Sequence, residues 1–215
     1  MKVAFLFLHP FSASLGSTVR IKELAISLHK SGVQCFILTP YEKSQTLYEG
    51  IEVICIDKFL HSSGLSDQIY RLTKSAYYNG FLVRRFLTTN SLQKLTSRIL
   101  DSVAKVIKEL EIDILQIEQD FAAIAAKDVL DSITIPVVVD LHNITSEELV
   151  AANVISNHSK EYDILQGQTQ ETLQHVDCIV VVSKEMRDYV VTKYGISSSK
   201  VIIVPPGGRP RVESV

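Results

Sequence analysis

The sequence alternates short apolar runs with segments of helical period, and this alternation constrains the fold more than any other feature. Several runs lack polar alternation, as in "IPVVVDL" at 135–141, which is typical of strands covered on both faces. Between the runs, apolar residues recur at helical spacing, for example over 21–28 before Gly32. Strands that alternate with helices form right-handed crossovers and a parallel sheet. The sequence therefore predicts an α/β fold, doubly wound, with a mainly parallel Rossmann-like sheet and helices on both faces.

The predicted sheet has about seven strands, read from the apolar runs. They cover residues 3–8, 33–38, 51–56, 113–118, 135–141, 178–183 and 201–204. Open sheets of this kind bind ligands outside the carboxyl ends of their strands. Those strand ends are therefore where functional side chains are expected.

Length and composition fit one large domain of ordinary globular character. The chain has 215 residues, of which 46% are hydrophobic and 21% are charged. Its first apolar run is too short for a signal peptide, and no run approaches the roughly 18 residues that cross a bilayer. Cys35, Cys55 and Cys178 lie in separate apolar runs, which predicts buried free thiols and a cytoplasmic protein.

The common cofactor motifs are missing from the sequence. Gly16 stands alone after the first strand, with neither a dinucleotide-binding glycine pattern nor a P-loop around it. No group of Cys and His has the spacing of metal ligands, and the nucleophile elbow of hydrolases is missing too. We therefore expect no metal and no bound cofactor.

The first loop leads from a strand into a helix and is rich in small and hydroxylic residues. A phosphate or sugar hydroxyl could bind at the helix N-terminus, where Gly16 permits close backbone approach and Ser17 offers a hydroxyl. The alternative is that Ser17 or Thr18 is simply an N-cap and Gly16 a turn residue. The sequence leaves both readings open.

The predicted strand ending in "VVVDLHN" carries the strongest candidate site. Asp140 and His142 share one side by period two, and His142 lies at or past the carboxyl end, next to Asn143. The imidazole could donate to a substrate oxygen, act as a base, or stabilise charge on a leaving phosphate. Alternatively, Asp140 and Asn143 cap the next helix, in which Thr145 and Glu148 have capping-box spacing.

Two other strand ends carry polar residues. Glu118 and Asp120 follow the strand at 113–118, where Glu118 either lines the crevice or is solvated. Ser183 precedes the helical segment "KEMRDYVVTKY", and an N-cap role explains it sufficiently.

Residues 68–100 form a basic, aromatic segment without a single acidic residue, although the whole chain has a net charge of -2. Its basic side chains and apolar stripe suit an anionic membrane surface or a phosphate-bearing acceptor. The residues expected to contact such an acceptor or membrane are Arg71, Lys74, Arg84 and Arg85. The alternative is an exposed helix that packs through its apolar stripe. No nucleic-acid-binding motif accompanies the charge, so nucleic acid is not an expected partner.

Four stretches together resemble a known family: the first loop and helix, "VVVDLHN", "VDCIVVVSKEMRDYVVTKYGISSSKVIIVP" and the final "PPGG". They resemble the N-terminal, acceptor-binding half of GT-B glycosyltransferases, in particular glycosyltransferase family 4, also called group 1. The resemblance covers about residues 1–208, although 60–112 match only in kind.

The resemblance implies an acceptor-binding domain that faces a donor-binding domain across an activated sugar, commonly a nucleotide diphosphate sugar. His142 aligns with the family's cleft histidine, which contacts the donor sugar, and Gly16 aligns with a glycine close to the donor phosphates. The implied activity is a retaining transfer of a sugar to a saccharide or lipid-linked acceptor, without a metal. It also implies a cytoplasmic protein, peripheral at the inner face of the membrane.

The sequence departs from the family at its end. Pro206 replaces the asparagine of the family's Pro-Asn-Gly turn, and residues 209–215 correspond only to the start of a hinge or tail. The donor-binding C-terminal domain is absent, so we expect the chain alone to be inactive, or nearly so, unless that domain or a partner subunit completes it. The alternatives are a non-catalytic binding or scaffold module and, with less support, half of a sugar-nucleotide epimerase.

Overall fold

The computed structural model describes residues 1–8, 16–39, 46–56, 102–130 and 132–206. Its strands are β1 (Lys2–Leu6), β2 (Gln34–Thr39), β3 (Thr46–Tyr48), β4 (Ile51–Cys55), β5 (Ile114–Glu118), β6 (Val137–Leu141), β7 (Cys178–Val181) and β8 (Val201–Ile203). Its helices are α1 (Gly16–Lys30), α5 (Asp120–Leu130), α6 (Thr145–Ala151), α7 (Lys160–His175) and α8 (Lys184–Tyr194); residues 102–110 are also helical, and Ser198–Lys200 form a 3-10 helix.

All eight described strands belong to one sheet, in the order β3-β4-β2-β1-β5-β6-β7-β8. Every neighbouring pair is parallel except β3 with β4. The seven predicted strands are confirmed, whereas β3 was not predicted. It has three residues, too few for a pattern of alternation, and it joins β4 through Glu49 and Gly50, which both have positive φ.

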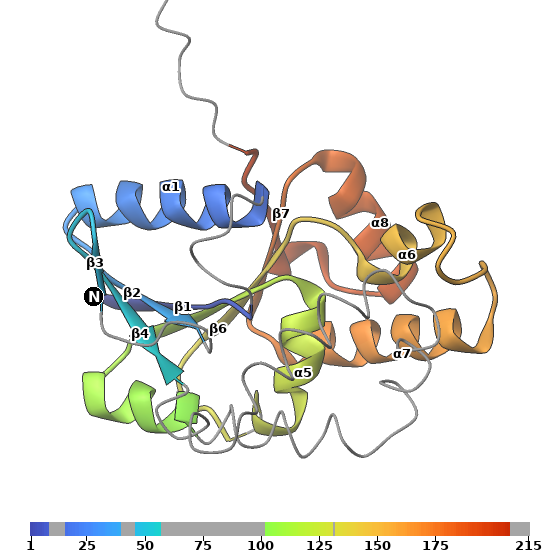
Figure 1. Cartoon of the computed structure of the whole chain (residues 1–215). Helices are drawn as coiled ribbons and strands as arrows, with labels where there is room; N and C mark the ends of the chain where they lie inside the picture. Colours follow the sequence, from blue (N-terminus) through green and yellow to red (C-terminus); the bar gives the residue numbers. More distant parts are fainter. Residues whose placement is uncertain (9–15, 40–45, 57–101, 131, 207–215) are drawn as a thin grey trace, which may run out of the picture.

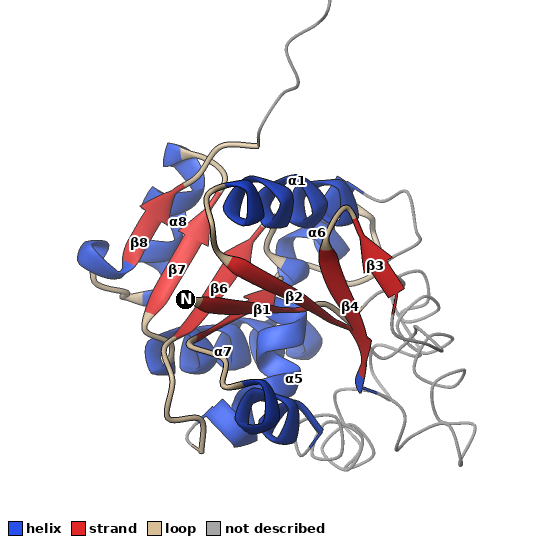
Figure 2. Cartoon of the chain, turned by 90° about the vertical axis from the view of Figure 1, so that its left-hand side faces the viewer, coloured by secondary structure: helices blue, strands red, loops and turns tan. Residues whose placement is uncertain are grey.

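Helices cover both faces of the sheet, as predicted. On one face lies α1, which packs through Ile21, Ala25 and Ile26 against β1, β2 and β4. On the other face, residues 102–110, α5, α7 and α8 enclose a second and larger core. Figure 1 shows α1 on the opposite side of the sheet from α5 and α7, and Figure 2 shows the parallel strands between them.

The ends of α1 follow the sequence pattern. After Lys30 the chain turns through Gly32, whose φ of +85° is in the left-handed region that glycine adopts without strain. The N–H of Val33 then donates to Leu28 O at 3.0 Å, and β2 begins at Gln34. This turn lies at the opposite end of α1 from the carboxyl edge of the sheet, so the Gly16 end of α1 faces that edge.

Cys35 and Cys55 are buried, Cys178 is half-buried, and all three are free thiols. None of the helices in the described ranges combines the length and the apolar character of a membrane span. The basic residues Arg71, Lys74, Arg84 and Arg85 lie outside the described residues, as does the end of the chain from 207 onward.

Candidate active site at the carboxyl edge of the sheet

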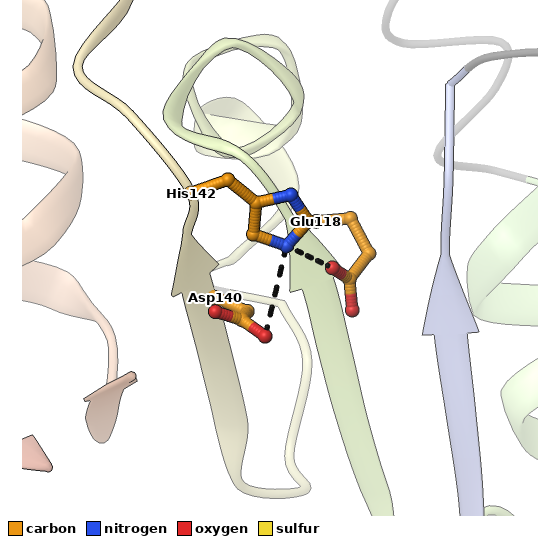
Figure 3. Close-up of side chains that lie close together, drawn as sticks. All are labelled: Glu118, Asp140 and His142. Carbon is orange, nitrogen blue, oxygen red and sulfur yellow. Dashed lines mark ion pairs between the residues drawn. The ribbon is translucent and has the colours of Figure 1, made fainter. Parts of the chain in front are cut away.

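Two carboxylates meet at the carboxyl edge because neighbouring strands end at the same level. The register pairs Glu118 of β5 with Asp140 of β6. Both side chains are almost completely buried, at 1% and 0% exposure. His142 directly follows β6 and lies over the two carboxylates (Figure 3). The strand end therefore holds an imidazole and two acids, and the prediction that Asp140 and His142 share one side is confirmed.

The imidazole faces both acids with one edge. His142 Nε2 lies 3.0 Å from Glu118 Oε2 and 3.7 Å from Asp140 Oδ2. The other oxygen of Glu118 accepts a hydrogen bond of 2.8 Å from the amide of Gln116, two residues earlier on the same strand. In Figure 3, His142 Nδ1 lies on the side of the ring away from the carboxylates. The solvated reading of Glu118 is therefore wrong, because its side chain is 1% exposed.

A third charged group completes the site from α1. Arg20 Nε donates to Asp140 Oδ2 at 2.9 Å, and Arg20 Nη2 donates to Asp140 Oδ1 at 3.2 Å. The same Nη2 donates to the carbonyl of Val204, directly after β8, at 3.0 Å. We call Arg20, Glu118, Asp140 and His142 the strand-edge cluster. In it, two cationic side chains face two buried carboxylates.

No sequence pattern indicated a role for Arg20. Its link to Asp140 spans 120 residues, so no local pattern shows it. Charge balance was the one indication of such a residue, because buried acids at a strand edge require a cationic partner. A basic residue one turn into the first helix, next to the apolar stripe that faces the sheet, was a candidate for that partner.

The charges of the cluster decide the protonation of His142. Burial lowers the pKa of His142, but the contacts with Asp140 and Glu118 and their charges outweigh burial and raise the pKa to about 9. Burial raises the pKa of Glu118, against the opposing effect of its contact with His142. The pair therefore holds a proton at neutral pH, with the imidazole as its cationic carrier. Of the roles considered for His142, a charged hydrogen-bond donor fits this state, and a general base does not.

The same cluster has the composition of a metal site. Glu118, Asp140 and His142 each offer one ligand atom, and these atoms lie within 4.8 Å of one another. However, Arg20 already occupies both oxygens of Asp140, and His142 carries the proton that a metal ion would have to displace. In the described structure, the two carboxylates are thus already balanced by two cations.

Asp120 lies close by but has a structural role. Its Oδ2 accepts from the N–H of Thr145 at 2.9 Å, and its Oδ1 accepts from the Thr145 hydroxyl at 2.5 Å. Burial raises the pKa of Asp120, while the hydrogen bonds from Thr145 act against this rise. Between Glu118 and Asp120, Gln119 has a φ of 74°, and this left-handed turn separates the two carboxylates. Asp120 therefore fixes the start of α6.

The capping interpretation of Asp140 and Asn143 is wrong. The N-cap of α6 is Ile144, which makes no side-chain cap, and the first N–H of the helix is bound by Asp120 from α5 instead. Asn143 donates to the side chain of Glu148, and no capping box forms, because Thr145 already lies inside the helix. The predicted N-cap Ser183 is confirmed, since its hydroxyl accepts from Met186 N at 3.2 Å.

The first turn of α1 borders the strand-edge cluster through Arg20. The helix begins at Gly16, so Ser17 and Thr18 lie within the first turn and neither is its N-cap. This turn contains no acidic residue, and a Cβ built on Gly16 would meet nothing within 4 Å. Thr18 is buried, and its hydroxyl has no hydrogen-bond partner among the described residues. The positive end of the helix dipole lies at this turn, where an anion is favoured.

Comparison with protein families gives a match over most of the chain. Residues 16–208 match the model of Glycosyltransferase Family 4. No curated protein matches the sequence. The matched range includes every member of the strand-edge cluster and all the described elements except β1.

Solved structures of low sequence identity share the fold. Sucrose-phosphate synthase from Thermosynechococcus elongatus has a TM-score of 0.66 at 10% identity, covering 95% of this chain and 47% of its own. A lipopolysaccharide outer core galactosyltransferase in its apo form has a TM-score of 0.53 at 11% identity, covering 95% and 45%. UDP-GlcNAc 2-epimerase from Methanocaldococcus jannaschii has a TM-score of 0.50 at 11% identity, with the same coverage. The chain thus spans about half the length of these three structures.

Proposed function

Because the chain belongs to Glycosyltransferase Family 4, we propose that it forms the acceptor-binding side of a retaining glycosyltransferase. The proposed reaction moves a sugar from a nucleotide diphosphate donor to a saccharide or lipid-linked acceptor. One observation carries the proposal above all. A cationic His142 is held by two buried acids at the carboxyl edge of the sheet and turns its free nitrogen away from them.

The chemistry of the donor explains why such a histidine is useful. When a sugar leaves a nucleotide diphosphate, negative charge develops on the departing phosphate oxygen. A positioned cationic donor stabilises that charge in the transition state. We assign this role to His142 Nδ1, with Nε2 held by Glu118 and Asp140, and we place Asn143 beside it in the crevice.

The first turn of α1 supplies the second anion-binding element. Arg20, one turn into this helix, bonds Asp140, so the turn lies next to the strand-edge cluster. Backbone N–H groups at a helix start bind phosphate well, and a glycine allows the phosphate to approach closely. We therefore assign the donor diphosphate to Gly16 and Ser17.

A complete active site needs a second domain. The chain spans about half the length of its structural neighbours, so we propose that a donor-binding domain completes it, in the same polypeptide or in a partner subunit. Without that domain, we expect the chain to be inactive or nearly so. We further propose that the basic segment contacts the acceptor or the anionic inner face of the cytoplasmic membrane. The contacting residues would be Arg71, Lys74, Arg84 and Arg85.

The test is transfer by the native protein, isolated from its source cells through an antibody against this domain. We expect a donor-dependent release of nucleoside diphosphate in the presence of acceptor, and a loss of about 10²–10³-fold in kcat for His142→Ala. The matched control is His175→Ala, which changes an exposed histidine on α7 and should retain full activity.

Three outcomes would contradict the assignment. Full turnover in His142→Ala would remove the histidine from the mechanism. Conversion of the donor to an epimer without transfer would favour the epimerase alternative, whose fold is also among the neighbours. The absence of turnover in the longest native form would favour the binding or scaffold alternative.

A further inference from the structure

Arg20 joins parts of the domain that are distant in sequence. Its guanidinium holds both oxygens of Asp140, at 2.9 and 3.2 Å, and binds the carbonyl of Val204 at 3.0 Å. The arginine side chain is 10% exposed and that of Asp140 is 0% exposed, so the pair is shielded from solvent. One side chain of α1 therefore connects β6, at the site, with the end of β8.

Val204 is the point at which the chain leaves the sheet. Its N–H donates to Val181 O on β7 at 2.9 Å, which is the last bond of this part of the sheet. Pro205 and Pro206 follow, and neither can donate a backbone hydrogen bond. Figure 1 shows the Gly16 end of α1 next to the segment that leaves β8. Arg20 thus links the segment that leaves β8 to the strand-edge cluster through hydrogen bonds.

We propose that Arg20 is a positioning residue that couples the place of the exit segment at Val204 to the orientation and protonation of His142. The inference rests on the proposed function, in which the segment after β8 leads to the donor-binding domain. A movement of that segment would stretch or break the hydrogen bond between Arg20 and the Val204 carbonyl. The guanidinium would then shift, and the orientation of Asp140 toward the imidazole would change. The orientation and protonation of His142 would then depend on the position of the second domain.

The charges around His142 explain why this coupling is effective. The described charged groups that face it are Glu118 from β5 and Asp140 from β6, and Arg20 from α1 balances Asp140. Arg20 Nε holds Oδ2, the same oxygen that lies 3.7 Å from His142 Nε2. Loss of the guanidinium leaves two uncompensated carboxylates facing the imidazole. That arrangement favours the protonated ring more strongly.

The first test is an NMR titration of the His142 ring in this chain and in Arg20→Met. The His142 signal is identified by its loss in His142→Gln. We expect Arg20→Met to raise the titration midpoint of His142 by at least one pH unit, a tenfold gain in proton affinity. The matched control is Lys30→Met, which removes one positive charge at the exposed far end of the same helix. A midpoint equal to that of the control would overturn the coupling to protonation.

The second test separates charge from geometry with Arg20→Lys. Lysine keeps the charge but cannot hold both oxygens of Asp140 and the carbonyl of Val204 together. We expect the His142 midpoint to stay near that of the unchanged chain, while hydrogen exchange at the Val204 N–H rises at least tenfold. Unchanged exchange would overturn the tether to β8. Both readouts are independent of turnover. They can therefore contradict the proposed role of Arg20 while the transferase activity is confirmed, and they can support that role while no transferase activity is found.

Discussion

Two polar clusters of this domain are built in opposite ways. The strand-edge cluster contains two acids, an arginine and a histidine, and its contacts leave His142 Nε2 and Glu118 Oε2 without a well-formed hydrogen bond. The second, which we call the helix cluster, consists of Glu147, Tyr162, Gln166 and Tyr189. Its single acid is surrounded by neutral donors.

The acid of the helix cluster accepts several hydrogen bonds. Glu147 Oε1 accepts from the hydroxyls of Tyr162 and Tyr189 at 2.6 and 2.5 Å and from Gln166 Nε2 at 3.0 Å. Burial opposes ionisation, but the hydrogen bonds from Tyr162 and Tyr189 outweigh it and lower the pKa of Glu147. The donors come from α7 and α8, so the carboxylate of α6 holds three helices together.

The difference separates a structural use of a carboxylate from a functional one. In the helix cluster, the hydroxyls of Tyr162 and Tyr189 both donate to the acid, and Gln166 Oε1, a neutral acceptor, is left without a partner among the described residues. In the strand-edge cluster, the charges cancel but the geometry stays incomplete, and the imidazole has an edge that faces away from its partners. Charge that is balanced yet not fully hydrogen-bonded is typical of a site built for a further partner.

Removal of the acid from the helix cluster should have the largest effect on stability. Glu147→Ala leaves two tyrosine hydroxyls and an amide without their acceptor, so we expect the free energy of unfolding to fall by about 3 kcal/mol. Urea denaturation measures the loss, and Tyr162→Phe, which removes one donor only, should lose about 1 kcal/mol. The activity of the folded native protein should not change. A loss for Glu147→Ala no greater than that of Tyr162→Phe would show that the cluster does not hold the helices.

The strand-edge cluster should instead make stability depend on pH. The pKa of His142 is raised from 6.5 to about 9 in the folded chain. The protonated histidine therefore stabilises the fold fully below pH 6.5, and this contribution is lost as the pH rises through 9. The loss amounts to up to about 3 kcal/mol. Urea denaturation at pH 6 and pH 9.5 should show the decrease in the unchanged chain.

His142→Gln should remove most of this pH dependence, because glutamine does not titrate. His175→Gln, at an exposed position on α7, should retain it. Equal slopes for the unchanged chain and His142→Gln would contradict the protonated state, and with it the role of His142 as a cationic donor.

The sequence predicted the elements well and the contacts between them less well. Asp140 and His142 were placed on one side of a strand end by their spacing, because the period of a strand is a local property. The pairing of Glu118 with Asp140 is a register between strands, and the sequence alone left Glu118 either in the crevice or in solvent. Arg20 was missed altogether, because its link to Asp140 depends on how α1 lies across the sheet.

The start of α6 shows the same limit. Spacing alone favoured a local capping box from Thr145 to Glu148, which is the common solution. The chain uses Asp120 instead, 25 residues away, and so leaves Asp140 to Arg20 and His142. A carboxylate supplied from another element frees the local ones for the site. Such a substitution of partners cannot be read from one sequence.

The smallest expected change in stability comes from Gly16→Ala. This variant tests the first turn of α1, which lies next to the strand-edge cluster. A Cβ at this position meets nothing within 4 Å, and alanine favours the helical conformation, so we expect stability to rise by up to about 1 kcal/mol. Gly167→Ala is the matched control, because it lies within α7 and its Cβ also meets nothing. Both variants should melt slightly higher than the unchanged chain.

If the donor phosphate approaches the backbone at Gly16, only Gly16→Ala should weaken donor binding, by about tenfold in KM of the native protein. Equal KM values for the two variants would remove the phosphate from the first turn of α1, and among the described residues would leave the strand-edge cluster as the proposed anion-binding element.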